Sequence, residues 1–133
     1  MDWIRVGRVV LCCSALGCSG RWETTTFTDE GDLCFEQRGA SVAVTVTAPD
    51  CLSSSCSRNV EGSCSATVDG TTIQLTSEIR WEDDEGKFAQ CTDDCGSASA
   101  ECDLGELPDG IYTVVHGEDE VQLVVPAEDA CVI

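Results

Sequence analysis

Cysteine is the residue type that offers the most chemistry in this chain, because a thiol can close a disulfide, bind a metal ion or carry a lipid. The 133 residues include 11 cysteines. Three of them stand near the N-terminus, and the other eight are spread over the rest of the chain, at Cys34, Cys51, Cys56, Cys64, Cys91, Cys95, Cys102 and Cys131. Eight cysteines can close as four disulfides in an oxidising compartment, and the sequence does not select one pairing.

Six of these cysteines form two similar triplets, one at positions 51, 56 and 64 and the other at 91, 95 and 102. Structural zinc sites favour more closely spaced pairs of the C-x2-C type. The first two cysteines of each triplet have four and three residues between them, and the single histidine, His116, is remote. We therefore expect disulfides rather than zinc, and we expect them to pin two long loops rich in Ser, Asp and Gly.

Carboxylates are the second group that could bind a ligand, because Ca2+ prefers oxygen donors. The acidic run at 82–85 contains Asp83 and Asp84, and Asp93 and Asp94 lie between two cysteines. The spacing of an EF-hand loop is absent. Solvated acidic turns are the simpler interpretation. A surface domain that binds Ca2+ or carbohydrate through these four aspartates stays open as an alternative.

Catalytic side chains are few. His116 is the one imidazole, and it stands beside a predicted hairpin turn, so we expect it on the surface. The G-x-S-x-G elbow of a nucleophilic serine and phosphate-binding glycine loops are both absent. The serine run 53–55 between Cys51 and Cys56 indicates a braced surface loop. It is compatible with a secreted protease inhibitor or enzyme, which is a further alternative, but we assign no catalytic residue.

The charge balance disfavours one class of partner. Seven Lys and Arg residues stand against 25 Asp and Glu residues, which gives a formal net charge of −18. A nucleic-acid-binding surface needs basic side chains that neutralise phosphates, so we expect no nucleic-acid partner. Docking on an anionic membrane surface through charge is disfavoured for the same reason.

Residues 1–17 have the layout of an export signal. Arg5 and Arg8 precede an apolar run at 9–16, and small residues follow it. This order of charged start, short apolar run and small-residue site is typical of a secretory signal peptide, which is removed from the mature protein. The apolar run is far shorter than the roughly 20 residues that span a bilayer, so we do not expect a permanent transmembrane helix.

The end of this signal, Ala15-Leu16-Gly17-Cys18, resembles the lipobox of bacterial lipoprotein precursors. In that family the cysteine thiol takes a diacylglycerol and becomes the first residue after cleavage, so the resemblance implies lipidation of Cys18. Ala15 departs from the pattern, since Leu is usual there, and ordinary cleavage that releases a soluble protein is the alternative. Ser19, rather than Asp, follows Cys18, which by resemblance implies sorting to the outer membrane. A periplasmic or secreted location is the alternative.

A second resemblance points to the same location. The segments CLSSSCS, CTDDCG and LPDGIYTVVHG are similar to segments of small cysteine-rich lipoproteins of myxobacteria. The resemblance implies contact with the membrane through a lipid anchor and an envelope or extracellular partner. It implies no particular activity.

Hydrophobicity beyond residue 32 has a period of two, which predicts half-buried strands. Val42, Val44 and Val46 share one face of a segment, and alternation recurs at 72–81 and 121–125. Turn signals separate such segments. Asp-Gly at 69–70 is a strong short-range hairpin signal, and a second hairpin is expected at 116–120. The count of candidate strands is about seven, as in small sandwiches.

We therefore predict an all-β fold, a small antiparallel β-sandwich stapled by disulfides, with a less regular stapled β fold as the alternative. Leu107, Gly110 and Tyr112 resemble the tyrosine corner of immunoglobulin-like sandwiches, which implies that the Tyr hydroxyl bonds back to the preceding corner.

The predicted division of the chain has three parts. Residues 1–17 are a removed signal peptide, residues 18–32 a lipidated tether with a first edge strand at 24–27, and residues 33–133 the disulfide-rich β domain. The expected function is that of an exported, lipid-anchored cell-envelope protein that acts as a structural or binding module without catalytic activity.

Overall fold

The computed structural model describes residues 21–86 and 90–132, with the backbone alone for Val132. The regular elements in these residues are all β-strands, so the predicted all-β class is confirmed. The nine strands are β1 (Trp22–Thr28), β2 (Asp32–Arg38), β3 (Ser41–Thr47), β4 (Ser57–Asp69), β5 (Thr72–Asp84), β6 (Ser99–Glu106), β7 (Gly110–His116), β8 (Asp119–Val125) and β9 (Ala130–Val132).

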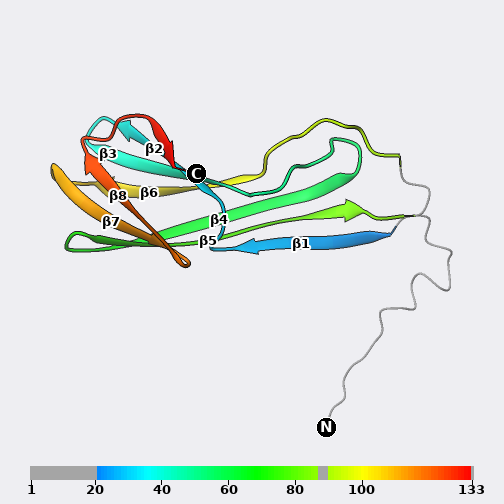
Figure 1. Cartoon of the computed structure of the whole chain (residues 1–133), viewed down its shortest axis with the longest axis horizontal. Coiled ribbons are helices and arrows are strands. Elements are labelled where there is room, and N and C mark those ends of the chain that lie inside the picture. Colours follow the sequence, from blue (N-terminus) through cyan, green and yellow to red (C-terminus); the bar gives the residue numbers. More distant parts are fainter. Residues whose placement is uncertain (1–20, 87–89, 133) are drawn as a thin grey trace, which may run out of the picture.

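The long strand β5 is the axis of the larger sheet, which also contains β1, β4, β7 and β8 (Figure 1). β4 runs antiparallel along one side of β5, and the other side takes β1 and β7 one after the other. β1 pairs antiparallel with residues 78–84, whereas β7 pairs parallel with residues 72–75. β8 follows as the antiparallel neighbour of β7. The parallel contact departs from the purely antiparallel sandwich that the sequence predicts.

The smaller sheet has the strand order β6-β3-β2-β9, with every pairing antiparallel. It covers the half of the larger sheet that contains β7 and β8 (Figure 1). Over the other half the second layer consists of two loops, 48–56 and 90–98. These loops continue the β3–β6 contact, since Ala48 N donates to Ala98 O over 2.9 Å and Leu52 and Gly96 exchange two bonds of 2.9 Å.

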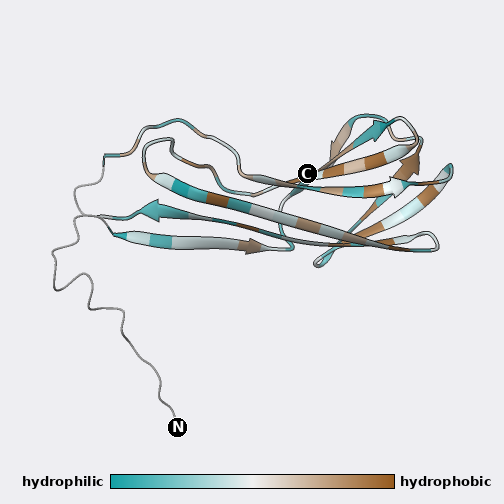
Figure 2. Ribbon diagram, turned by 180° about the vertical axis from the view of Figure 1, so that it is seen from behind, coloured by the Kyte–Doolittle hydropathy of each residue, from teal (hydrophilic) through white to brown (hydrophobic). Residues whose placement is uncertain are grey.

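Side chains alternate between the two faces of each strand, and those on the inner faces form the core between the two layers. In β5 every second residue from Ile73 to Trp81 is buried, and the β3 valines Val42, Val44 and Val46 have no exposed surface. Burial of such a side chain stabilises the fold by about 1.5–3 kcal/mol. Figure 2 shows the hydrophobic residues concentrated on the strands where two sheets face each other, and fewer of them on the half that the loops cover.

All eight cysteines from Cys34 to Cys131 pair with one another. The disulfides are Cys34–Cys131, Cys51–Cys95, Cys56–Cys91 and Cys64–Cys102. Each cysteine of the first triplet bonds to one of the second, which no spacing rule predicts. One bond ties β4 to β6 and thereby joins the two sheets, one ties β2 to the terminal strand β9, and the other two staple the long loops to each other.

The turns follow the residues that predict them. Gly70, with φ of 63°, allows the tight connection from β4 to β5, and Gly117, with φ of 61°, does the same between β7 and β8. The Tyr112 hydroxyl donates to Pro108 O over 2.6 Å, which is the bond implied by the resemblance to a tyrosine corner. This contact fixes the start of β7 on the corner that precedes it.

The first strand lies where the sequence predicts a tether. β1 occupies Trp22–Thr28 and pairs with β5 over its whole length, so seven residues of the segment 18–32 belong to the larger sheet. Its hydrophobic pattern is weak because only Phe27 contributes an apolar side chain to the inner face, where its ring centroid lies 5.6 Å from that of Trp81. The predicted edge strand at 24–27 is the middle of this element.

Candidate functional site

The two stapled loops form one structural unit at the end of the domain where β1 begins. The Cys51–Cys95 and Cys56–Cys91 bonds are nested, so they hold 51–56 and 91–95 against each other in opposite directions. Cys56 is buried, whereas the other three cysteines are exposed. The disulfides replace a regular ladder here, because the only β-bridge in this unit is the one between Leu52 and Gly96.

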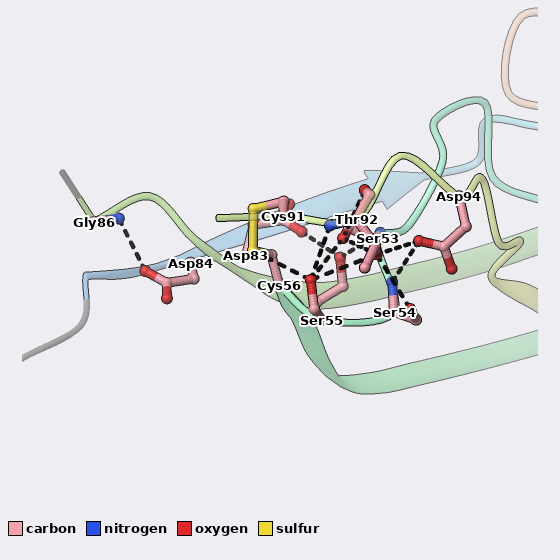
Figure 3. Close-up of a disulfide and its surroundings, with 11 residues drawn as sticks. Ser53, Ser54, Ser55, Cys56, Asp83, Asp84, Gly86, Cys91, Thr92 and Asp94 are labelled. Carbon is pink, nitrogen blue, oxygen red and sulfur yellow. Dashed lines mark hydrogen bonds between the residues drawn. A yellow bond between two sulfur atoms is a disulfide. The ribbon is translucent and has the colours of Figure 1, made fainter. Parts of the chain in front are cut away.

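Hydroxyl groups connect the two loops beside the Cys56–Cys91 bond (Figure 3). Ser53 Oγ lies 2.9 Å from Thr92 Oγ1 and donates to Thr92 O over 3.1 Å, while Thr92 N donates to Ser55 Oγ over 2.9 Å. Asp94 accepts bonds from the Thr92 hydroxyl and from Ser54 N. These bonds hold the pKa of the Asp94 carboxyl below its usual value, with Thr92 as the largest cause. The network therefore stabilises a charged Asp94.

The serine run is a turn rather than an extended loop. Cys56 N and Ser57 N both donate to Ser53 O, over 3.2 Å and 2.9 Å. Strand-like recognition of a peptide segment requires extended backbone with free main-chain groups. The serine side chains also bond to the facing loop, so this geometry does not favour the insertion of residues 53–55 into a protease cleft.

The Asp83 carboxylate accepts hydrogen bonds from neighbouring side chains of the protein. It accepts bonds from Ser57 Oγ over 2.6 Å, from Trp81 Nε1 over 2.9 Å and, at 3.4 Å, from Thr25 Oγ1. These donors come from three neighbouring strands, β4, β5 and β1. A half-buried carboxylate with this many donors anchors the strands beneath the stapled loops and satisfies the indole N–H of buried Trp81.

The four aspartates predicted as a calcium site are divided among separate contacts. Asp83 is held inside the sheet as described, Asp84 accepts a 2.9 Å bond from Gly86 N, Asp94 belongs to the hydroxyl network, and Asp93 is exposed. In residues 21–86 and 90–132, no three side chains of the metal-binding types gather around a common point. Ca2+ binding stays a prediction from the sequence, and these contacts do not support it.

His116 is buried, with 1% of its surface exposed, and the prediction of a surface residue is wrong. His116 is the last residue of β7. It lies beside β5, at the junction between the residues that pair with β7 and those that pair with β1, and its Nε2 lies 2.8 Å from Ser77 Oγ. Its Nδ1 is buried and has no hydrogen-bond partner among the described atoms. Burial lowers the pKa of His116, and the nearby carboxylates Asp29 and Asp119 oppose this shift. The imidazole is thus a neutral interior group.

A polar trough runs along the outer face of the larger sheet over β4 and β5. It consists of three hollows of about 260, 230 and 410 Å3 that share lining residues. Glu61 and Arg80 line the first two, and Ser63 and Glu78 line the second and third. We call this surface the polar trough. Its side chains offer hydroxyl, amide, guanidinium and carboxylate groups together.

Charged pairs order one end of the polar trough. Arg80 Nε donates to Glu61 over 2.8 Å, and Glu82 accepts bonds of 2.8 Å from Arg58 Nε and from Asn59 Nδ2. The Arg58 guanidinium lies 3.6 Å from the centroid of the Trp22 ring. These donors lower the pKa of Glu82, with Arg58 as the largest cause. Asn59 reaches Glu82 because a bulge with φ of 52° interrupts β4 there.

A further hollow, apolar in character, lies at the opposite end of the domain. It has a volume of about 400 Å3 and lies between β8 and β9. Its lining residues are Phe35, Gln122, Leu123, Val124, Pro126, Glu128 and Ala130. We call it the β8–β9 groove. No motif in the sequence identifies it or the polar trough, because each arises where separate strands meet. The exposed valine Val124 is the one local signal, since it interrupts the expected polar outer face.

Cys18 and the signal peptide at 1–17 lie outside the described residues, so their predicted roles stay predictions. In the part of the chain that is described, no helix has the length and apolar character needed to cross a bilayer. Comparisons with protein-family models, with curated proteins and with solved structures found no match to this chain.

Proposed function

We propose that the protein is an exported binding module of the cell envelope, held at the membrane by a lipid on Cys18. The observation that carries the proposal is the completeness of the disulfide set. The eight cysteines from Cys34 to Cys131 pair among themselves, so the domain needs no bond from Cys18. Disulfides persist in oxidising compartments outside the cytosol. The lipobox resemblance then supplies a use for Cys18 that the fold does not.

A binding role is supported by how the domain is built. Four disulfides and two layers brace the scaffold, and its surfaces carry two concave regions of several hundred cubic ångströms, the polar trough and the β8–β9 groove. Pre-formed concave surfaces on a rigid scaffold are where proteins bind ligands. Ser77 Oγ and His116 Nε2 form a hydroxyl–imidazole pair, and both residues are buried, with 5% and 1% of their surfaces exposed.

The experiment is the intact mass of the protein extracted from membranes of expressing bacteria, measured with thiol alkylation before and after reduction. We expect a chain that starts at Cys18, carries a diacylglycerol and offers eight further thiols only after reduction. The matched control is Cys18→Ser, which should lose the lipid and keep the four disulfides. An unprocessed chain whose thiols react without reduction would overturn the proposal.

A second candidate function is glycan binding in the polar trough. Sugar hydroxyl groups need neighbouring donors and acceptors, and Glu61, Arg80 and Asn59 supply both around one hollow. Affinity electrophoresis against soluble neutral polysaccharides tests this, with Arg80→Ala as the trough variant. Arg38→Ala is the control, because Arg38 makes a similar ion pair, with Glu101, on the other sheet. Retardation of the wild type that only the Arg80 variant loses supports glycan binding, and no retardation of the wild type contradicts it.

A further inference from the structure

The open edge of β8 has main-chain groups that no neighbouring strand uses. β8 pairs with β7 alone among the described strands. Thr113 N donates to Thr71 O over 2.8 Å, so it points away from β8, and the Thr113–Gln122 pair is therefore of the non-hydrogen-bonded kind. It follows that the N–H and C=O of Gln122 point to the open edge. By alternation those of Val124 do as well.

The edge between Asp119-Glu120 at the start of β8 and Pro126 after it lacks the usual protection. Natural sheets guard their edges with charged side chains, prolines or bulges. Residues 121–125 carry no charge, and their register with β7 is regular. Val124 is 58% exposed and Ile111, directly opposite it, is 59% exposed, which are the highest values among the large hydrophobic side chains of the described chain. Exposed apolar surface of this kind marks interaction sites.

The β8–β9 groove lies beside the same edge. Leu123, Val124 and Pro126 line it from the β8 side, and Phe35 and Ala130 from the other sheet. A strand added to β8 would direct every second side chain toward the interior of the sandwich, because side chains alternate across a strand. The groove can therefore receive apolar side chains of an added strand while the edge bonds its backbone.

The charge around this edge selects the partner. Between Leu107 and Val132 there is no Lys or Arg, and the acidic residues there are Asp109, Glu118, Asp119, Glu120, Glu128 and Asp129. Complementary charge suppresses wrong partners and speeds association with right ones. A second copy of this acidic chain is repelled, whereas a segment with flanking lysines or arginines is attracted.

We propose that β8 binds an extended segment of a partner protein by strand addition, and that this segment alternates apolar and polar residues between basic flanks. Main-chain bonds to the edge would give affinity, and side chains in the β8–β9 groove would give specificity, as in other cases of strand addition. The inference rests on the proposed function, since it names the partner class of the binding module.

The test uses a synthetic peptide, acetyl-KKVTVTVKK-amide, and the folded domain with its four disulfides intact. Binding is measured by calorimetry at physiological salt. The edge variant is Gln122→Pro, which removes an outward N–H and leaves the β7 ladder unchanged, and Gln122→Ala is its matched control. We expect Gln122→Pro to weaken binding by about tenfold or more, and Gln122→Ala by less than about twofold. Circular dichroism shows whether each variant is folded.

A second measurement needs no variant. Hydrogen exchange of the Gln122 and Val124 amides in the wild-type protein should slow when the peptide is added, while that of Thr113 stays unchanged. Two control peptides have glutamates in place of the lysines or proline in place of the central valine, and we expect neither to bind.

Equal binding by the Glu-flanked peptide, equal binding by Gln122→Pro, or no protection at Gln122 would overturn strand addition at β8. Such a result with a lipidated, four-disulfide protein refutes this inference alone. Peptide binding by a chain that is never processed at Cys18 refutes the proposed function alone.

Discussion

The nested disulfides of the stapled loops should stabilise the domain by less than their sequence separations suggest. Treated alone, Cys51–Cys95 closes a loop with a separation of 44 residues and Cys56–Cys91 one of 35. The chain-entropy relation then gives about 4.0 and about 3.8 kcal/mol. The perturbation that tests this is the double variant Cys51→Ser/Cys95→Ser, and its counterpart at Cys56 and Cys91.

Nesting reduces the free energy of unfolding that is lost with either bond, because the other bond still holds the two loops together. Cys51 and Cys56 are five positions apart and Cys91 and Cys95 are four positions apart, so the remaining bond already joins the two ends through nine positions of the chain. Closure of so short a loop contributes about 2.6 kcal/mol. We expect each double variant to lose that amount, measured as the free energy of unfolding in urea without reductant.

Removal of both bonds should cost more than twice that loss. The shortest remaining covalent path between positions 51 and 95 then passes through Cys64–Cys102. It covers 13 positions from 51 to 64 and seven from 95 to 102. Its closure adds about 3.3 kcal/mol, for a total near 5.9 kcal/mol. If each double variant instead loses about 4 kcal/mol and the quadruple variant about 7.8, the loops close independently and the reasoning from nesting is refuted.

Three further predictions concern single residues. Burial lowers the pKa of His116, so the unfolded chain binds the proton before the folded one as the pH falls. The contribution of His116 to stability is therefore complete above about pH 6.5 and is lost as the pH falls toward the folded-state pKa. Between pH 7 and 5, the free energy of unfolding in urea should decline less for His116→Gln than for the wild type. Tyr112→Phe loses the bond to Pro108 O and should cost about 0.5–1.5 kcal/mol in the same assay at pH 7, with no effect if the corner is unimportant. Gly62→Ala would place a Cβ 2.6 Å from Ser99 O, so the melting temperature should fall by several degrees, and an unchanged value would show that β4 and β6 can separate there.

Much of the fold can be predicted from the sequence because its central strands have one clean apolar face. The alternation at Val42–Val46 and at 121–125 identifies β3 and β8, and the Asp69-Gly70 turn identifies the β4–β5 connection. The prediction gives about seven strands because no signal identifies β9, which has three residues, or β6, which contributes only Ala100, Cys102 and Leu104 to the core. In β4 only Cys64 and Ala66 are partly buried against it, so period two is scarcely visible there.

The sites depend on relations between strands that the sequence does not encode locally. Cys51 and Cys56 pair with Cys95 and Cys91 because loops 48–56 and 90–98 lie side by side as the second layer, which follows from the position of β6 beside β3. His116 was expected at the surface because it stands next to a turn, yet the junction of β1 and β7 on β5 encloses it. Neither relation has a sequence signature within a short window.

The start of β1, to which the proposed anchor is connected, and the proposed docking edge lie at opposite ends of the domain. Trp22 pairs with Asp84 at one end of β5, and β7, the neighbour of β8, pairs with residues 72–75 at the other (Figure 1). Cys18 lies four residues before Trp22, so it is within about 14 Å of the start of β1. The 13 residues of β5 span about 43 Å, which separates the two ends.

This separation predicts how the lipidated protein binds. The formal net charge of −18 repels an anionic bilayer, so a domain held at Cys18 should project its β8 edge away from the lipid. The peptide KKVTVTVKK should therefore bind the lipidated protein in neutral phosphatidylcholine vesicles within about twofold of its affinity for the soluble Cys18→Ser variant. Neutral vesicles are required because the basic peptide would itself bind anionic lipid. If anchoring abolishes binding while the four disulfides remain intact, the β8 edge faces the membrane, and strand addition cannot be the function of the anchored protein.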